Sequence, residues 1–191
     1  MTDKQKNDSC DTYVCSYKMA FMLDNWFRKL LQNPAKIVGE YINEGDTVID
    51  FGCGPGFFSI AMAGMVGKQG KIIAADLQVE MLEHAKRKAA AKNLSDRIEF
   101  HHCEKDRVGL ELTKKADFML AYYMIHELPN PGAFFQEARS FLKTGGKFLV
   151  VEPKWHVTRE KYQEMLGLAE NAGFSVLAFP KKKGGRSVLL T

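Results

Sequence analysis

The chain has 191 residues, of which 46% are hydrophobic and 26% are charged, with a net charge of +4. This length suffices for one domain with its own core, and the composition is that of an ordinary globular protein. The charge falls short of a nucleic-acid binder's, no apolar run approaches the ~18 residues of a membrane span, and the polar N-terminus does not resemble a signal peptide. We therefore expect a cytoplasmic protein with no membrane span and no nucleic-acid partner.

Apolar runs of strand length alternate with segments of helical period along the chain. Helix is expected before the first strand, in "SYKMAFMLDNWFRKLLQN" and again from Asn33–Pro34 to Ile42. The other predicted elements, in chain order, are strand Thr47–Phe51, helix Phe57–Met65, strand Lys71–Asp76, helix Val79–Lys92, strands Ile98–His102 and Asp117–Tyr122, helix Pro131–Leu142, strand Lys147–Glu152, helix Thr158–Ala172, and strands Ser175–Phe179 and Ser187–Leu190. This alternation indicates an α/β fold with a parallel sheet, and the near-continuous apolar strands indicate helices on both faces. The short connection "PKKKGGR" predicts an antiparallel hairpin at the end.

The stretch "VIDFGCGPGFFSIAMA" places three glycines between the first strand and the first helix of the sheet. Glycine lets a ligand lie against the backbone, and a loop at the carboxyl end of a strand is where open α/β sheets bind ligands. Asp50 precedes the loop, and Asp76 ends the next strand, where a carboxylate can accept both ribose hydroxyls. Such carboxylates suit a cationic nucleoside better than a diphosphate. As alternatives, Asp76 caps the following helix and Asp50 accepts turn amides.

Four segments together resemble a class I S-adenosylmethionine-dependent methyltransferase, of the group typified by the ubiquinone/menaquinone C-methyltransferases. They are "VIDFGCGPG", "IIAAD", "ADFMLAYYMIHEL" and "LKTGGKFLVVEP". The resemblance covers residues 34–190 and implies a Rossmann-like class I fold, with a seven-stranded, mostly parallel sheet that contains one antiparallel strand. It also implies S-adenosylmethionine as cofactor and S-adenosylhomocysteine as product. We divide the chain into an N-terminal helical lid or extension, residues 1–33, and a cofactor-binding domain, residues 34–191.

By this resemblance, Asp50 and the glycine loop hold the methionine part of the cofactor, and Asp76 holds the ribose. Leu77 and Met81 pack on the adenine, while Cys103 and Glu104 lie near its amine, where the family often carries Gly-Asp. The cofactor-binding residues predicted in this way are Asp50, Gly52, Cys53, Gly54, Gly56, Asp76, Leu77, Met81, Cys103, Glu104 and Tyr122.

Methyl transfer from a sulfonium depends chiefly on in-line positioning and desolvation, and a base is needed only when the acceptor loses a proton. In the loop "YYMIHELPNP", His126 is the candidate base because an imidazole takes a proton near neutral pH. Its neighbour Glu127 is the candidate for orienting the imidazole or the acceptor. Structural roles are the alternatives: a backbone hydrogen bond for His126 and a capped turn for Glu127.

Aromatic and acidic residues in two segments are candidates for an acceptor pocket. "EPKWH" places Glu152 and Trp155 after the fifth strand, and the N-terminal segment contributes Tyr13, Tyr17 and Phe21 as part of a lid. An aromatic stripe at helical spacing also fits ordinary core packing, and Trp155 also fits packing beneath a loop.

The sequence therefore predicts a methyltransferase that acts on a small molecule and needs no metal. Three alternatives stay open. The first is thiol-dependent methylation of a metalloid such as arsenite, with Cys10, Cys15 and Cys103 as ligands. The second is a non-catalytic cofactor-binding module. The third is RNA methylation, with "KKKGGR" as a phosphate contact.

Overall fold

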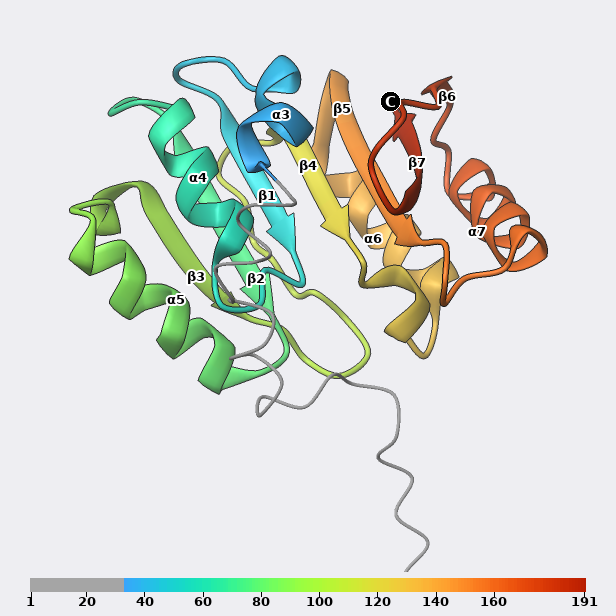
Figure 1. Cartoon of the computed structure of the whole chain (residues 1–191), viewed down its shortest axis with the longest axis horizontal. Coiled ribbons are helices and arrows are strands. Elements are labelled where there is room, and N and C mark those ends of the chain that lie inside the picture. Colours follow the sequence, from blue (N-terminus) through green and yellow to red (C-terminus); the bar gives the residue numbers. More distant parts are fainter. Residues whose placement is uncertain (1–32) are drawn as a thin grey trace, which may run out of the picture.

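The computed structural model describes residues 33–191, which form one seven-stranded sheet between two layers of helices (Figure 1). The strand order is β3-β2-β1-β4-β5-β7-β6, and only β7 runs antiparallel to its neighbours. The strands are β1 (Thr47–Phe51), β2 (Lys71–Asp76), β3 (Ile98–His102), β4 (Ala116–Tyr122), β5 (Leu142–Pro153), β6 (Val176–Ala178) and β7 (Gly185–Leu190). The predicted seven-stranded, mostly parallel sheet with a final antiparallel hairpin is confirmed.

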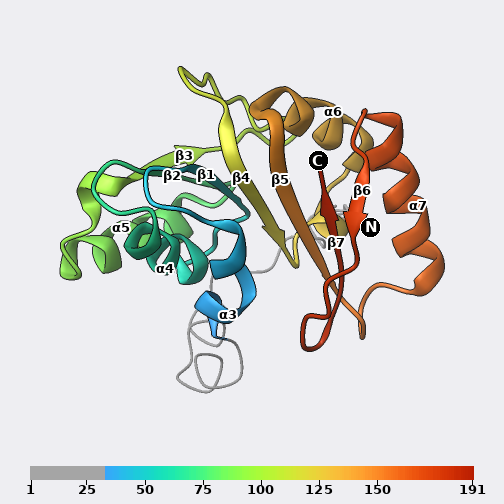
Figure 2. The same ribbon diagram turned by 90° about the horizontal axis from the view of Figure 1, so that it is seen from above.

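Alternate residues of the central strands enter two separate cores. Val48 packs with the helices on one face, and its neighbour Ile49 packs with those on the other. Successive side chains of a strand point to opposite faces, so a strand covered on both sides is apolar throughout. Figure 2 shows α3, α4 and α5 on one side of the sheet and α6 and α7 on the other.

The α-helices of the described residues flank the sheet, and a side chain caps the start of three of them. They are α3 (Pro34–Val38), α4 (Phe57–Met65), α5 (Val79–Ala91), α6 (Pro131–Phe141) and α7 (Arg159–Asn171), with short 3-10 turns η2 (Gly39–Tyr41), η3 (Ser95–Arg97) and η4 (Ile125–Glu127). The side chains of Asn33, Asn130 and Thr158 accept the first free N–H groups of α3, α6 and α7. Two of these helices also have proline in their first turn, which needs no N–H donor there.

Strand β5 is longer than predicted. The sequence places a loop at "TGG", but α6 ends at Phe141 and β5 begins at once with Leu142. Leu142 pairs with Ala116 and Lys147 with Phe118, so the residues between them form a bulge in β5. Gly145 has a φ of 77°, which a bulge tolerates best at glycine.

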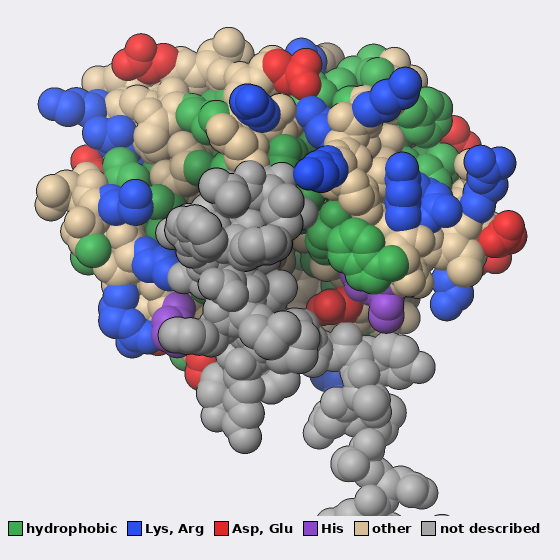
Figure 3. Space-filling view, viewed as in Figure 1, with side chains coloured by type: hydrophobic (Ala, Val, Ile, Leu, Met, Phe, Trp, Pro, Cys, Tyr) green, Lys and Arg blue, Asp and Glu red, His purple; other side chains and the backbone are tan. Residues whose placement is uncertain are grey.

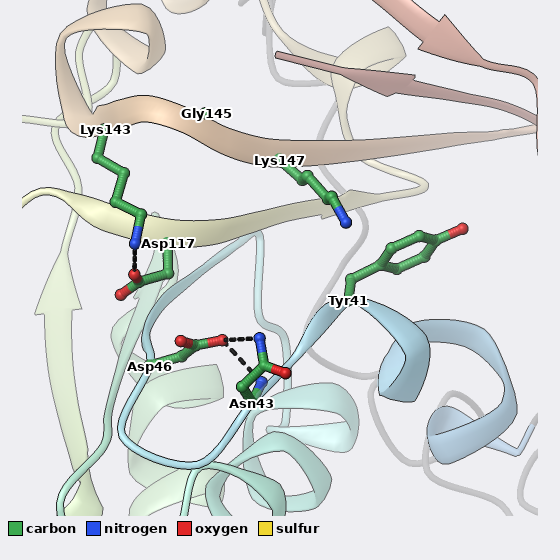
Figure 4. Close-up of a pocket in the computed structure, with 7 residues that line it drawn as sticks. All are labelled: Tyr41, Asn43, Asp46, Asp117, Lys143, Gly145 and Lys147. Atoms are coloured by element: carbon green, nitrogen blue, oxygen red, sulfur yellow. Dashed lines mark hydrogen bonds and ion pairs between the residues drawn. The ribbon is translucent and has the colours of Figure 1, made fainter.

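The amino ends of the central strands form a polar hollow away from the glycine loop. It is lined by Tyr41, Asn43, Asp46, Asp117, Lys143, Gly145 and Lys147. Figure 4 shows that its carboxylates are already engaged: Asp117 pairs with Lys143, and Asp46 accepts both N–H groups drawn from Asn43. Among residues 33–191, no helix is both long and apolar enough to cross a bilayer.

Candidate functional site

The glycine loop between β1 and α4 is held tightly at both ends and is open in the middle. A Cβ on Gly52 would lie 2.9 Å from the Cβ of Met124, and one on Gly56 would lie 2.9 Å from the Cβ of Ala85. A Cβ on Gly54 would meet no heavy atom of the described residues within 4 Å. All three glycines have positive φ, which other residues rarely adopt. The outer two glycines therefore permit close packing, and the middle one leaves backbone that the side chains of residues 33–191 do not cover.

Asp76 fastens this loop to the start of α5. Its Oδ2 accepts the N–H of Gly54 at 2.8 Å, and its Oδ1 accepts the N–H of Gln78 at 2.8 Å. The side chain is buried, and burial raises the pKa of Asp76, although these two N–H groups act in the opposite direction. The predicted alternative of a simple helix cap is incomplete, because one oxygen of the carboxylate binds the loop.

Asp50 is the second carboxylate beneath the loop. It is 2% exposed, and its Oδ2 accepts the hydroxyl of Ser59 at 2.5 Å. Ser59 lies in the first turns of α4, so this bond joins the end of β1 to the helix that follows the loop.

These residues fit S-adenosylmethionine. Two buried carboxylates flank a stretch of backbone that no side chain of residues 33–191 covers, and together they favour a cation and repel a diphosphate. Each carboxylate oxygen has two lone pairs, so Asp76 can accept ribose hydroxyls in addition to its backbone partners. Asp50 and the loop would then hold the amino-acid part, and Asp76 the ribose. When bound, the cofactor supplies a methyl group on a cationic sulfur.

The residues predicted around the adenine lie beside Asp76, with different exposure. Met81 is buried in the first turn of α5, while Leu77 is 37% exposed. The backbone N–H of Cys103 donates to the carbonyl of Asp76 at 2.9 Å, which brings β3 to this place. Glu104, in contrast, has an exposed side chain that pairs with Arg107, so its predicted contact with the cofactor would require this pair to open.

His126 and Glu152 lie together at the carboxyl ends of β4 and β5. The Nδ1 atom of His126 lies 2.5 Å from Oε2 of Glu152, which is 1% exposed. Glu127, the partner expected from the sequence, lies 3.9 Å from the other ring nitrogen. Glu152 rather than Glu127 therefore makes the close contact with the imidazole, and this contact is with a carboxylate instead of the backbone group of the structural alternative.

Two aromatic side chains, Tyr123 and Trp155, lie beside this pair. Tyr123 directly follows β4 with a φ of 62°, and its ring meets Trp155 edge-on, with 5.4 Å between centroids. Trp155 is 72% exposed, so it does not pack beneath a loop as the alternative had it. The predicted cofactor residue Tyr122 is buried on the α4 side against Phe58. Figure 3 shows exposed hydrophobic side chains next to histidine and acidic side chains at this edge of the sheet.

Some predicted residues lie outside the described part of the chain, namely Tyr13, Tyr17, Phe21, Cys10 and Cys15. Others were missed: Ser59, Tyr123 and Met124 support the site, and the sequence analysis assigned them no role. Ser59 had a readable signal, since it is the one hydroxyl in the apolar helix "FFSIAMAGM". Tyr123 and Met124 had none, because their roles depend on backbone conformation and on contacts across the chain.

Comparisons with known proteins agree with this geometry. A family model described as a methyltransferase domain matches residues 42–179. The chain is 30% identical over 117 residues to the tRNA 5-carboxymethoxyuridine methyltransferase of Escherichia coli K12, which covers 61% of this chain and 44% of that protein. It is 29% identical over 112 residues to the demethylmenaquinone methyltransferase of Lactobacillus johnsonii, covering 58% and 45%.

A solved structure extends the likeness over nearly the whole chain. The S-adenosylmethionine-dependent methyltransferase from Aquifex aeolicus superposes with a TM-score of 0.82 at 26% identity, covering 93% of this chain and 98% of that one. By contrast, the chain spans less than half the length of the curated relatives above. The family match covers well over half of the sequence, and the chain belongs to the class I S-adenosylmethionine-dependent methyltransferases.

Proposed function

We propose that this chain transfers the methyl group of S-adenosylmethionine to a small-molecule acceptor at the carboxyl edge of the sheet. The observation that carries the proposal is the backbone at Gly54, which no described side chain approaches, between the buried carboxylates Asp50 and Asp76 and on the same edge as His126. Residues of the loop and of the ends of β1 and β2 would bind the cofactor. His126 would face the acceptor, with Glu127 beside it.

The charges around the site favour a small acceptor over RNA. Among the described residues, the carboxylates of Asp50 and Asp76 lie at the loop, and those of Glu127 and Glu152 lie at the histidine. Acidic groups repel a phosphate backbone, which is bound by clusters of lysine and arginine. The lysines of "KKKGGR" lie in the connection between β6 and β7. This connection reaches the same edge of the sheet, since a Cβ on Gly184 would lie 3.3 Å from Trp155 and from Tyr123, and its Lys182 pairs with Glu40.

Tyr123 and Trp155 supply an aromatic surface next to the histidine, which suits an acceptor with a flat or apolar body.

A thiol-dependent reaction on a metalloid has less support in the described residues. Burial raises the pKa of the Cys103 thiol to about 12, and Asp76 and Glu137 add to the effect. The thiolate is the form that binds soft metals, so this thiol is a poor ligand at neutral pH.

RNA methylation is the second candidate, because one relative is named as a tRNA methyltransferase. The test is to incubate the protein with methyl-labelled S-adenosylmethionine and, separately, total tRNA and the small-molecule fraction of a cell extract. We expect label in the small-molecule fraction, where mass spectrometry identifies the product. Label in tRNA instead would overturn the small-molecule assignment, and label in neither fraction would favour a non-catalytic module.

A further inference from the structure

Glu152 ties the histidine loop to the sheet with both of its oxygens. It lies near the end of β5 with 1% of its surface exposed. Its Oε1 accepts the N–H of Ile125 at 3.0 Å, and its Oε2 meets Nδ1 of His126 at 2.5 Å. Ile125 and His126 are successive residues of η4, so one buried carboxylate fixes both the backbone and the imidazole of this turn.

This contact determines which ring nitrogen carries the proton. An ionised carboxylate only accepts hydrogen bonds, so Nδ1 of His126 must be the donor. In the neutral imidazole the other nitrogen, Nε2, then has a free lone pair. Nε2 lies on the side of the ring away from Glu152, with Oε1 of Glu127 at 3.9 Å.

Charged groups from three segments surround the imidazole. Burial lowers the pKa of His126, but the hydrogen bond and charge of Glu152, with the charge of Glu127, outweigh it and raise the pKa above its usual value. His156, in the loop after β5, meets the ring with 4.8 Å between centroids. Tyr162 of α7 and Arg186 of β7 lie near Glu152. The charge of Arg186 lowers the pKa of the Tyr162 phenol, and the charge of Glu152 raises it. An imidazolium formed at His126 is therefore stabilised mainly from the Nδ1 side.

We propose that Glu152 is a positioning residue for methyl transfer, holding His126 with Nε2 as the proton acceptor, and that the acceptor is methylated at an O–H, N–H or C–H group. This inference rests on the proposed function and narrows its substrate class. An acceptor atom without a proton, as in a thioether or a tertiary amine, would not need this arrangement.

The acceptor's electron pair bonds to the methyl carbon while the carbon–sulfur bond breaks and leaves its pair on the sulfur. The proton of the acceptor atom passes to Nε2 of His126, and the resulting imidazolium keeps its Nδ1–H bond to Glu152. The imidazolium later returns its proton to water, which restores the base. No oxidant or further reactant is required.

The positioning role is tested by NMR on the whole chain labelled with 15N-histidine, for wild type, Glu152→Gln and Glu127→Gln. In the wild type we expect the Nδ1–H tautomer of His126 above its pKa. Glu152→Gln should lower the pKa of His126 and mix the two tautomers, because it removes the charge that holds Nδ1–H. Glu127→Gln is the matched control: it removes the same charge near the other nitrogen, at a longer distance, and should lower the pKa less and leave the tautomer unchanged.

An Nε2–H tautomer in the wild type would overturn the positioning role, and so would a Glu152→Gln protein whose pKa and tautomer match the wild type. If Glu152→Gln does not fold, the wild-type tautomer still decides.

The substrate class is tested on the product formed from labelled S-adenosylmethionine and the small-molecule fraction. A product in which methyl replaces a proton on oxygen, nitrogen or carbon supports it, whereas a sulfonium or quaternary ammonium product overturns it. Calorimetric binding of S-adenosylmethionine to the same variants separates the two proposals, because binding should survive Glu152→Gln. If the wild type itself does not bind S-adenosylmethionine, the proposed function is overturned instead.

Discussion

The carboxylate of Asp76 has two tasks in the proposed site, since it holds Gly54 in place and faces the position assigned to the ribose. Asp76→Asn keeps the size of the side chain and removes its charge. We expect S-adenosylmethionine to bind about 10-fold or more weakly, because a hydrogen bond to a charged group contributes about 1.5–3 kcal/mol. Isothermal titration calorimetry measures this directly.

Asp96→Asn is the matched control for that experiment, since Asp96 is exposed in η3, on the far side of β3 from the loop. It should bind the cofactor like the wild type. Equal affinity in the two variants would remove Asp76 from the cofactor site.

At the scale of single residues, the side chains of the site could be predicted from the sequence, but the contacts between them could not. His126 and Glu152 were each singled out from the sequence, yet their contact spans 26 positions and no local pattern encodes it. The sequence suggested Glu127 because it is adjacent, but neighbours in a 3-10 turn need not face each other. Because β4 and β5 are adjacent in the sheet, their carboxyl ends bring Glu152 closer to the imidazole than Glu127, which is the neighbour in sequence.

At the scale of elements, the junction between the glycine loop and α4 is the most constrained. Gly56 is the N-cap of α4 with a φ of 80°, and a Cβ there would lie 2.9 Å from that of Ala85 on α5. Gly56→Ala should therefore lower the free energy of unfolding by about 1–3 kcal/mol, from backbone strain alone. Urea denaturation measures the change.

Gly64→Ala provides the comparison on the same helix. A Cβ on Gly64 would meet no heavy atom of the described residues within 4 Å, and Gly64 lies within α4, where alanine is preferred by about 0.5–1 kcal/mol. We expect this variant to be more stable than the wild type. A Gly56→Ala protein as stable as Gly64→Ala would contradict the predicted backbone strain at Gly56.

The elements themselves could largely be predicted, because each depends on a local signal. The predicted helices start at Pro131 and Thr158; α6 begins at Pro131, and Thr158 is the N-cap of α7. The beginning of β5 could not be predicted. Two successive glycines usually indicate a loop, whereas here pairing with β4 carries Gly145 and Gly146 within the strand. Tertiary hydrogen bonding overrode the local preference.

At the scale of the whole molecule, cofactor binding should stabilise the fold as a unit, because the site draws on β1, β2, α4 and α5 together. At a concentration 100 times its Kd, a ligand adds about 2.7 kcal/mol to the folded state, which raises Tm by about 5–10 °C in a domain of this size. Differential scanning fluorimetry with S-adenosylmethionine tests this. NAD at the same concentration should leave Tm unchanged, and a rise with NAD alone would contradict the site as assigned.

The two outer strands of the sheet bear on how the protein behaves at high concentration. β6 is only three residues long and leads into the lysines of the hairpin, while β3 carries Glu99, His101 and His102 among its five residues. Short edge strands with polar side chains disfavour hydrogen bonding of a strand from another molecule to the edge of the sheet. Extending β6 with valine or isoleucine would remove that protection. We then expect molecules to associate edge to edge and form insoluble aggregates.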